Sequence, residues 1–161
     1  MNKNLYILGA GGHTRSLINL LEYNNLIIDG ILDEFYSEDQ NELINGYKIC
    51  GNIDLILKET QIVLSFGDNA KRELFFNKFN SNVYRNNLIH PRTIIEKHSF
   101  LGESNQLFAN VLVNSGVIVG NNNILNSHCI LEHESEIGNH NHISVGSVIC
   151  GRSKIGSRCF I

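Results

Sequence analysis

The pair His133-Glu134 is the feature of this sequence best suited to acid–base chemistry. A carboxylate beside an imidazole fixes its tautomer and raises its basicity, so the histidine can take a proton from an attacking amine or hydroxyl group. The alternative is a surface histidine without a chemical role, because the chain has seven histidines.

A glycine-rich segment near the N-terminus, Gly9-Ala-Gly-Gly-His13, is the second candidate site. It stands between an apolar run and an amphipathic stretch, where backbone amides at a helix N-terminus can bind an anion such as a phosphate. Thr14 occupies the third glycine position of the dinucleotide-binding fingerprint, so a plain strand-to-helix turn is the alternative. Asp33 and Gly67 each follow a later apolar run and would share the same edge of a sheet, although Asp33 could equally be a solvated loop acid.

The elements that must position these N-terminal residues alternate between strands and helices. Leu17, Ile18, Leu20 and Leu21 have helical spacing. Strands are expected over 5–8, 27–32 and 62–66, a turn-rich connector over 46–51, and helices over 53–58 and 70–79, the last with Leu74, Phe75 and Phe79 facing inward. This alternation predicts a Rossmann-like α/β domain with a small parallel sheet over residues 1–85.

The pattern changes completely from Ile89 onward. An Ile, Leu or Val recurs at every sixth position up to Ile161, thirteen times in succession, and a compact residue stands four places after each of the first twelve. No helix has a period of six, whereas three hexapeptides make one eighteen-residue coil of a triangular prism with the aliphatic side chains inside. Glycines that recur every eighteen residues suit one corner of that prism (102, 120, 138 and 156). Residues 86–161 therefore predict a parallel β-helix of about four coils.

This coil period gives His133 a neighbour. His133 stands two places after an interior aliphatic residue, so its ring should project outward, and Gly151 should lie directly above it. The Gly151 amide is then a candidate donor to an oxyanion. Because the sequence stops at Ile161, on an interior position, we expect either a shortened C-terminus, which we favour, or another element that covers this end.

Composition excludes several classes of protein. The net charge of −3 and a pI near 6.1 argue against a nucleic-acid partner. The apolar runs are too short to span a bilayer, and the N-terminus does not look like a signal peptide. The four cysteines form no CxxC motif, so we expect reduced thiols and a cytoplasmic protein.

Five segments, taken in order, resemble the bacterial hexapeptide-repeat sugar acetyltransferases of the NeuD/PglD type. They are Gly9–His13, Ile31–Glu34, Phe66–Asn69, Leu88–Pro91 and Ile124–Gly138. That family includes sialic-acid O-acetyltransferases and UDP-4-amino-sugar N-acetyltransferases, and the resemblance covers essentially the whole chain. Family members continue for further coils beyond the position of Ile161, so full activity of this chain is in question.

The resemblance implies a homotrimer whose N-terminal domain binds a nucleotide sugar and whose C-terminal domain is a left-handed β-helix. Acetyl-CoA would lie between neighbouring prisms, and no metal would be needed. The resemblance also implies that His133 is the general base and Glu134 its partner. The Gly151 amide would donate a hydrogen bond to the oxyanion, and His142 would contact acetyl-CoA. The residues that match the nucleotide-sugar site are Gly11, Gly12, His13, Asp33, Glu34 and Gly67.

Two other functions stay open on the sequence. The chain could be a non-catalytic nucleotide-sugar-binding remnant that lacks a full site for acetyl-CoA. It could also be a zinc enzyme similar to the γ-class carbonic anhydrases, because His128, His133, His140 and His142 are close in sequence. Those enzymes, however, carry no glycine-rich strand–helix domain in front of the prism.

Overall fold

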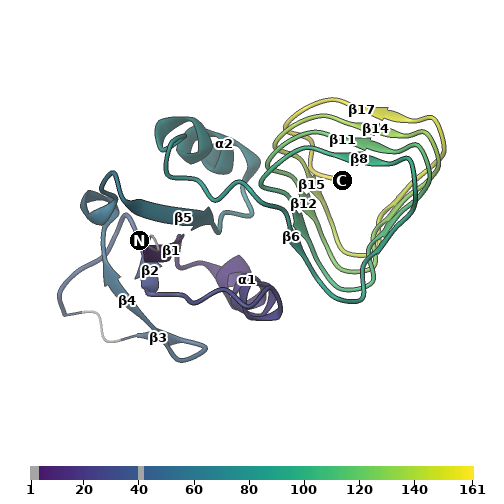
Figure 1. The fold of residues 1–161 in the computed structure, drawn as a ribbon. Helices are drawn as coiled ribbons and strands as arrows, with labels where there is room; N and C mark the ends of the chain where they lie inside the picture. The colour runs from purple at the N-terminus through teal and green to yellow at the C-terminus, as the bar shows by residue number, and fades with distance from the viewer. Residues whose placement is uncertain (1–3, 40–41) are drawn as a thin grey trace. The chain divides into compact units, whose positions relative to one another are not determined.

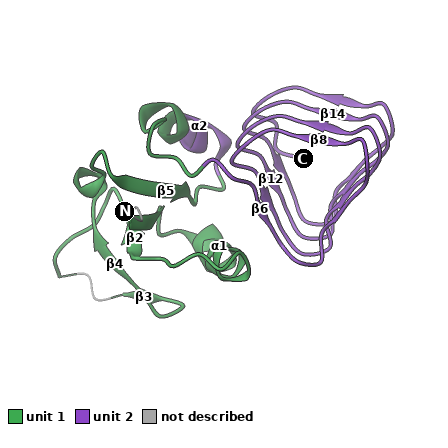
Figure 2. Cartoon of the chain, in the orientation of Figure 1, with its two compact units in different colours: residues 1–67, 74–84 green, residues 68–73, 85–161 purple. Residues whose placement is uncertain are grey.

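The computed structural model describes residues 4–39 and 42–161, which form two compact units (Figure 1, Figure 2). One unit contains the chain up to residue 67 together with 74–84, and the other contains 68–73 and 85–161. The predicted fold class is confirmed, since a Rossmann-like α/β unit precedes a left-handed parallel β-helix of hexapeptide repeats. Among the described residues, none of the helices has the length and hydropathy needed to cross a membrane.

The N-terminal unit is built on a five-stranded sheet in the order β3-β4-β2-β1-β5. Strands β4, β2, β1 and β5 are parallel, and β3 pairs with β4 in the antiparallel sense. On α1, the four predicted core leucine and isoleucine side chains are all buried. The elements are β1 (Asn4–Leu8), α1 (Gly12–Tyr23), β2 (Gly30–Leu32), β3 (Leu43–Ile44), β4 (Tyr47–Gly51), η1 (Ile53–Leu55), β5 (Thr60–Leu64) and α2 (Asn69–Lys78).

The expected connector over residues 46–51 is wrong, because most of it is strand β4. Asn45 and Gly46 both have positive φ angles, 48° and 88°, and they turn the chain between β3 and β4. Asn-Gly is the pair that a two-residue hairpin turn of this kind favours. The sheet therefore gains an antiparallel edge, and the predicted helix over 53–58 shrinks to the three-residue η1.

The inward face of α2 also differs from the expectation. Leu74 is 62% exposed, whereas Phe76 is buried beside Phe75. The Phe75 ring stacks on Phe66 with centroids 5.0 Å apart, and both join the core formed by β1, β2 and β5. The two adjacent phenylalanines fix the rotation of the helix, and this turns Leu74 outward.

The C-terminal unit is a prism of two-residue strands joined by tight corners. Its three parallel sheets are β6-β9-β12-β15, β7-β10-β13-β16 and β8-β11-β14-β17, and every pair is offset by eighteen residues, as in Leu112 opposite Ile130. The predicted six-residue period is thus confirmed. The strands are Leu88–Ile89, Ile94–Ile95, Phe100–Leu101, Gln106–Leu107, Leu112–Val113, Ile118–Val119, Ile124–Leu125, Ile130–Leu131, Glu136–Ile137, His142–Ile143, Val148–Ile149 and Lys154–Ile155 (β6 to β17).

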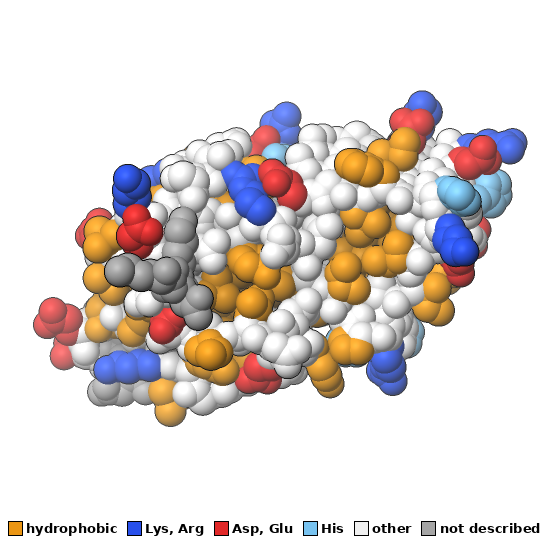
Figure 3. Space-filling model, viewed as in Figure 1, with side chains coloured by type: hydrophobic (Ala, Val, Ile, Leu, Met, Phe, Trp, Pro, Cys, Tyr) orange, Lys and Arg blue, Asp and Glu red, His pale blue; other side chains and the backbone are white. Residues whose placement is uncertain are grey.

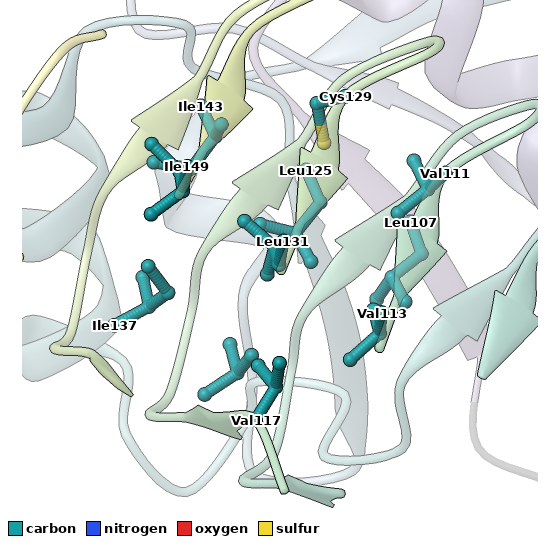
Figure 4. Close-up of a cluster of buried hydrophobic side chains, with 11 residues drawn as sticks. Leu107, Val111, Val113, Val117, Leu125, Cys129, Leu131, Ile137, Ile143 and Ile149 are labelled. Carbon is teal, nitrogen blue, oxygen red and sulfur yellow. The ribbon is translucent and has the colours of Figure 1, made fainter. Parts of the chain in front are cut away.

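The prism interior is filled by the aliphatic residue of each hexapeptide, and Figure 4 shows these side chains pointing towards one another. The compact positions complete this core, and three of them form a buried ladder of Asn105, Asn123 and Asn141. The Asn105 Oδ1 accepts from the Asn123 backbone N–H at 2.9 Å, and the Asn123 Oδ1 accepts from Asn141 at 2.8 Å. The buried side-chain oxygens of this ladder are satisfied because backbone amides one coil away donate to them.

The corners of the prism put equivalent residues one above another. At one corner His98, Gly116, Glu134 and Arg152 follow at eighteen-residue intervals, all with left-handed φ angles between 58° and 73°. At the corner predicted from the glycine repeat, a Cβ on Gly120 would lie 2.7 Å from the Gly138 carbonyl oxygen, so this corner admits only glycine where another coil lies above it, which is not the case at Gly156. The stacked corners decide which side chains become neighbours.

Residues 68–73 attach to the prism through Arg72, which is completely buried. Its guanidinium donates to the carbonyl oxygens of Asn122, His140 and Asn141 at 3.2, 2.9 and 2.9 Å. Burial lowers the pKa of Arg72 to about 10, and the nearby Asp68 carboxylate opposes that shift. One side chain thus joins two successive coils.

Candidate functional site

His133 follows strand β13, and its imidazole ring is 56% exposed. Its Nδ1 lies 3.3 Å from Glu134 Oε2. On the other side of the ring, Nε2 faces Gly151, where an added Cβ would lie 2.6 Å from that nitrogen. The structure therefore brings the three residues of the predicted catalytic group together.

Glu134 is held by a residue that the sequence reasoning missed. The Arg152 Nε donates to Glu134 Oε2 at 2.8 Å, so the same oxygen faces both the guanidinium and the His133 ring. The hydrogen bond from Arg152, and then that from His133, lowers the pKa of the Glu134 carboxyl. Counting eighteen residues from Glu134 would have found Arg152, just as the same count from His133 found Gly151.

The Gly151 amide is free to donate a hydrogen bond. One and two coils below, the amides of His133 and Ser115 donate to the side-chain oxygens of the preceding residues, Glu132 at 3.4 Å and Asn114 at 2.7 Å. Cys150, which precedes Gly151, has no side-chain oxygen that could accept a hydrogen bond from the Gly151 amide. Within residues 4–39 and 42–161, the Gly151 amide makes no hydrogen bond to another residue. An oxygen of a bound molecule could take this position.

His142 lies on strand β15, in a different sheet of the prism from β13. It is 7% exposed, and its Nε2 lies 3.2 Å from Asn126 Nδ2. The centroids of the His142 and Phe160 rings are 4.8 Å apart, in an edge-on arrangement. Within one chain, His142 is therefore not part of the group around His133.

The histidines considered as zinc ligands contact different residues. His128 Nε2 lies 3.1 Å from Asn110 Nδ2, and His140 Nδ1 lies 2.8 Å from Asn122 Nδ2. In the part of the single chain that the structure describes, no three His, Cys, Asp or Glu residues are grouped so that they could hold a metal ion.

The six candidate nucleotide-sugar residues meet at one edge of the N-terminal sheet. Gly11 caps α1 after β1, Gly12 and His13 begin that helix, Asp33 and Glu34 follow β2, and Gly67 follows β5. Strands β2, β1 and β5 are adjacent and parallel, so their carboxyl ends open on the same edge. This is the edge where open α/β sheets bind ligands.

Most of the N-terminal unit matches a known family model. Residues 4–79 match the family model described as the PglD N-terminal domain. No curated protein sequence is a significant match to the chain.

Solved structures resemble the whole chain at 18–20% identity, and this likeness shows the fold. The acetyltransferase domain of PglB from Neisseria gonorrhoeae in complex with acetyl coenzyme A has a TM-score of 0.76 at 19% identity, with 98% of this chain and 86% of that chain covered. PerB from Caulobacter crescentus, in complex with CoA and GDP-perosamine, has a TM-score of 0.77 at 20% identity (98% and 84% covered). WeeI from Acinetobacter baumannii has a TM-score of 0.83 at 18% identity (98% and 76% covered). The expected resemblance to NeuD/PglD-type proteins is confirmed.

In the N-terminal unit, Asp33 makes hydrogen bonds that its position in the sequence did not indicate. Its Oδ2 accepts from the Ala10 amide at 2.9 Å, and its Oδ1 accepts from the Phe35 amide at 2.9 Å. Asp33 therefore holds the glycine-rich loop in shape, and Glu34 beside it is exposed.

Thr14, the departure from the glycine fingerprint, is buried and also structural. Its hydroxyl donates to the Gly9 carbonyl oxygen at 2.9 Å and lies 2.8 Å from Ser65 Oγ. A glycine would lose this link between the ends of β1 and β5. The glycine-rich turn is thus fixed by side chains while Gly11 and Gly12 stay exposed.

Proposed function

We propose that the protein is an acetyl-CoA-dependent acetyltransferase that acts on an amino or hydroxyl group of a nucleotide-linked amino sugar or a sialic-acid-like sugar. The observation that carries this proposal is the position of the His133 ring, with the Glu134 carboxylate at Nδ1 and the unpaired Gly151 amide beside Nε2. The match to the PglD N-terminal domain model and the fold shared with proteins solved with acetyl coenzyme A, or with CoA and GDP-perosamine, support the choice of substrates.

In the proposed reaction, both substrates react directly and no covalent enzyme intermediate forms. Glu134 accepts a hydrogen bond from the Nδ1–H of His133, which keeps that proton on Nδ1 and leaves the Nε2 lone pair free to take a proton from the sugar amine or hydroxyl. The deprotonating nitrogen or oxygen forms a bond to the thioester carbonyl carbon, and the Gly151 amide donates to the resulting oxyanion. Collapse breaks the carbon–sulfur bond, and the proton held by His133 goes to the departing CoA thiolate.

The nucleotide sugar would bind at the sheet edge of the N-terminal domain. The exposed backbone of Gly11 and Gly12, at the start of α1, suits the diphosphate, because helix N-termini favour anions. His13, Glu34 and Gly67 would line the same site, and Asp33 would act by keeping the loop in shape.

The active molecule would be a homotrimer with acetyl-CoA bound between neighbouring prisms. One outer face of the prism carries a column of aliphatic residues, Ile94, Leu112, Ile130 and Val148, and the two end residues are each 56% exposed. Figure 3 shows apolar side chains at the surface over both units. A second copy would cover such a column, and His142 would then line the groove for acetyl-CoA.

The test is acetyl transfer by the full chain from acetyl-CoA to UDP-linked and GDP-linked 4-amino sugars and to sialic acid, followed by chromatography of the sugar product. The His133→Ala variant should lose transfer, whereas the control His128→Ala, at another corner of the prism, should keep it. Unchanged turnover in His133→Ala would refute the mechanism. Calorimetry that finds binding of the UDP-sugar without binding of acetyl-CoA would favour the binding remnant, and stoichiometric zinc in the purified protein would favour the zinc enzyme.

A further inference from the structure

Arg152 is the only cation that the described residues place against the His133–Glu134 pair. The two nitrogen atoms that approach Glu134 Oε2 are Arg152 Nε at 2.8 Å and His133 Nδ1 at 3.3 Å. The contact of the carboxylate with the arginine is thus the shorter of the two.

The backbone enforces this arrangement. Glu134 and Arg152 occupy equivalent left-handed corner positions on successive coils, with φ angles of 58° and 60°. The Arg152 amide donates to the His133 carbonyl oxygen at 3.0 Å, which fixes the spacing between the two coils at this point. The two side chains leave stacked corners in the same direction and meet at Oε2.

A glutamate that is 56% exposed needs a restraint if it is to orient a neighbouring ring. An exposed ion pair contributes little to stability, since solvent screens it and both side chains lose rotamer freedom. The same contact can still decide which carboxylate rotamer is populated. A carboxylate held at Nδ1 keeps the proton on that nitrogen and leaves Nε2 unprotonated.

We propose that Arg152 is a positioning residue, which holds the Glu134 carboxylate at His133 Nδ1 and so keeps Nε2 available as a proton acceptor. Its effect on catalysis rests on the function proposed above, whereas its effect on the His133 tautomer does not. Arg152 would act through Glu134 and would not touch either substrate.

The chain offers a matched control in Lys154. Lys154 lies on the same coil as Arg152, and its Nζ pairs with Glu136 Oε1 of the coil below at 2.8 Å. Its exposure of 73% is close to the 76% of Arg152. Lys154→Met therefore removes the same charge from the same coil, and from an ion pair of the same kind, away from His133.

The experiment measures the His133 tautomer by ¹⁵N NMR, together with steady-state kinetics, in the full-chain wild type and its variants. Arg152→Met should shift His133 towards the Nε2–H tautomer and lower kcat by about two- to fivefold, the range expected for loss of one exposed charged contact, with KM for acetyl-CoA unchanged. Arg152→Lys should restore part of kcat, and Lys154→Met should match the wild type. In a Glu134→Gln background, Arg152→Met should have no further effect.

Four results would overturn the proposal. They are an unchanged tautomer in Arg152→Met, a raised KM for acetyl-CoA with unchanged kcat, an equal loss in Lys154→Met, or an undiminished effect of Arg152→Met in the Glu134→Gln background. If the wild type transfers no acetyl group, the proposed function fails. The tautomer measurement then still decides whether Arg152 positions Glu134.

Discussion

Replacing Gly151 with alanine should displace the His133 ring without unfolding the prism. The new Cβ would stand 2.6 Å from His133 Nε2 and 2.7 Å from Cε1, whereas ordinary contact begins at 3.4 Å, so the ring must retreat by about 0.8 Å. The φ angle of Gly151 lies outside the left-handed region, so the backbone accepts alanine. The exposed ring can swing into solvent, and this keeps the effect on folding small.

A catalytic group misplaced by about 1 Å can cost about a hundredfold in rate, so we expect kcat of Gly151→Ala to fall by about 10- to 100-fold. The Tm should stay within about 2 °C of the wild type. Steady-state acetyl transfer and thermal melting followed by circular dichroism measure the two quantities. Gly156→Ala is the control, because a Cβ there meets nothing within 4 Å. Wild-type kcat in a folded Gly151→Ala, or an equal loss in both variants, would refute the role assigned to the ring.

Three further predictions concern the same unit. Cys150→Asn should bring a side-chain oxygen to accept a hydrogen bond from the Gly151 amide, as Asn114 does for Ser115, and lower kcat about tenfold. Cys150→Ala adds no such acceptor and should leave kcat unchanged. Equal kcat in both variants would contradict the role of the Gly151 amide as a donor. Arg72→Met should remove the hydrogen bonds from the guanidinium to three backbone carbonyl oxygens and lower the free energy of unfolding in urea by about 2–4 kcal/mol. A change near zero would contradict this. Burial, opposed by Glu73, lowers the pKa of His140, so the unfolded state binds more protons and stability should fall as the pH drops below about 6.5. His140→Asn should weaken that loss between pH 7.5 and 5.5, and an identical pH dependence would exclude this histidine as its source.

The prism could be predicted in detail because its period is fixed by the sequence itself. Once the aliphatic residues set the coil at eighteen, simple counting places Gly151 above His133, and the same counting places Arg152 above Glu134. That the Gly151 amide has no hydrogen-bond partner within its own chain was harder to predict. It depends on Cys150, which has no side-chain oxygen, whereas Asn114 and Glu132 at the equivalent positions below accept from the amides that follow them.

The N-terminal unit was less predictable, because its contacts come from loops and from the rotation of helices. The Asn45-Gly46 turn signal was present in the sequence, but the strand before it, β3, has only two residues. The orientation of Leu74 depends on how two neighbouring phenylalanines enter the core. That Asp33 binds backbone amides depends on the folded shape of two loops, which residue spacing does not reveal.

The stacking of equivalent corners limits how this protein can change in length. One residue inserted between Glu134 and Gly151 would bring Cys150 over the imidazole and turn the aliphatic side chains of every later level away from the interior. An insertion of eighteen residues at the same place would keep the aliphatic side chains facing the interior, but it would place a new coil between His133 and Gly151. Between Glu134 and Gly151, only substitution leaves Gly151 above the His133 ring, whereas a coil added below Lys97 would not change this arrangement.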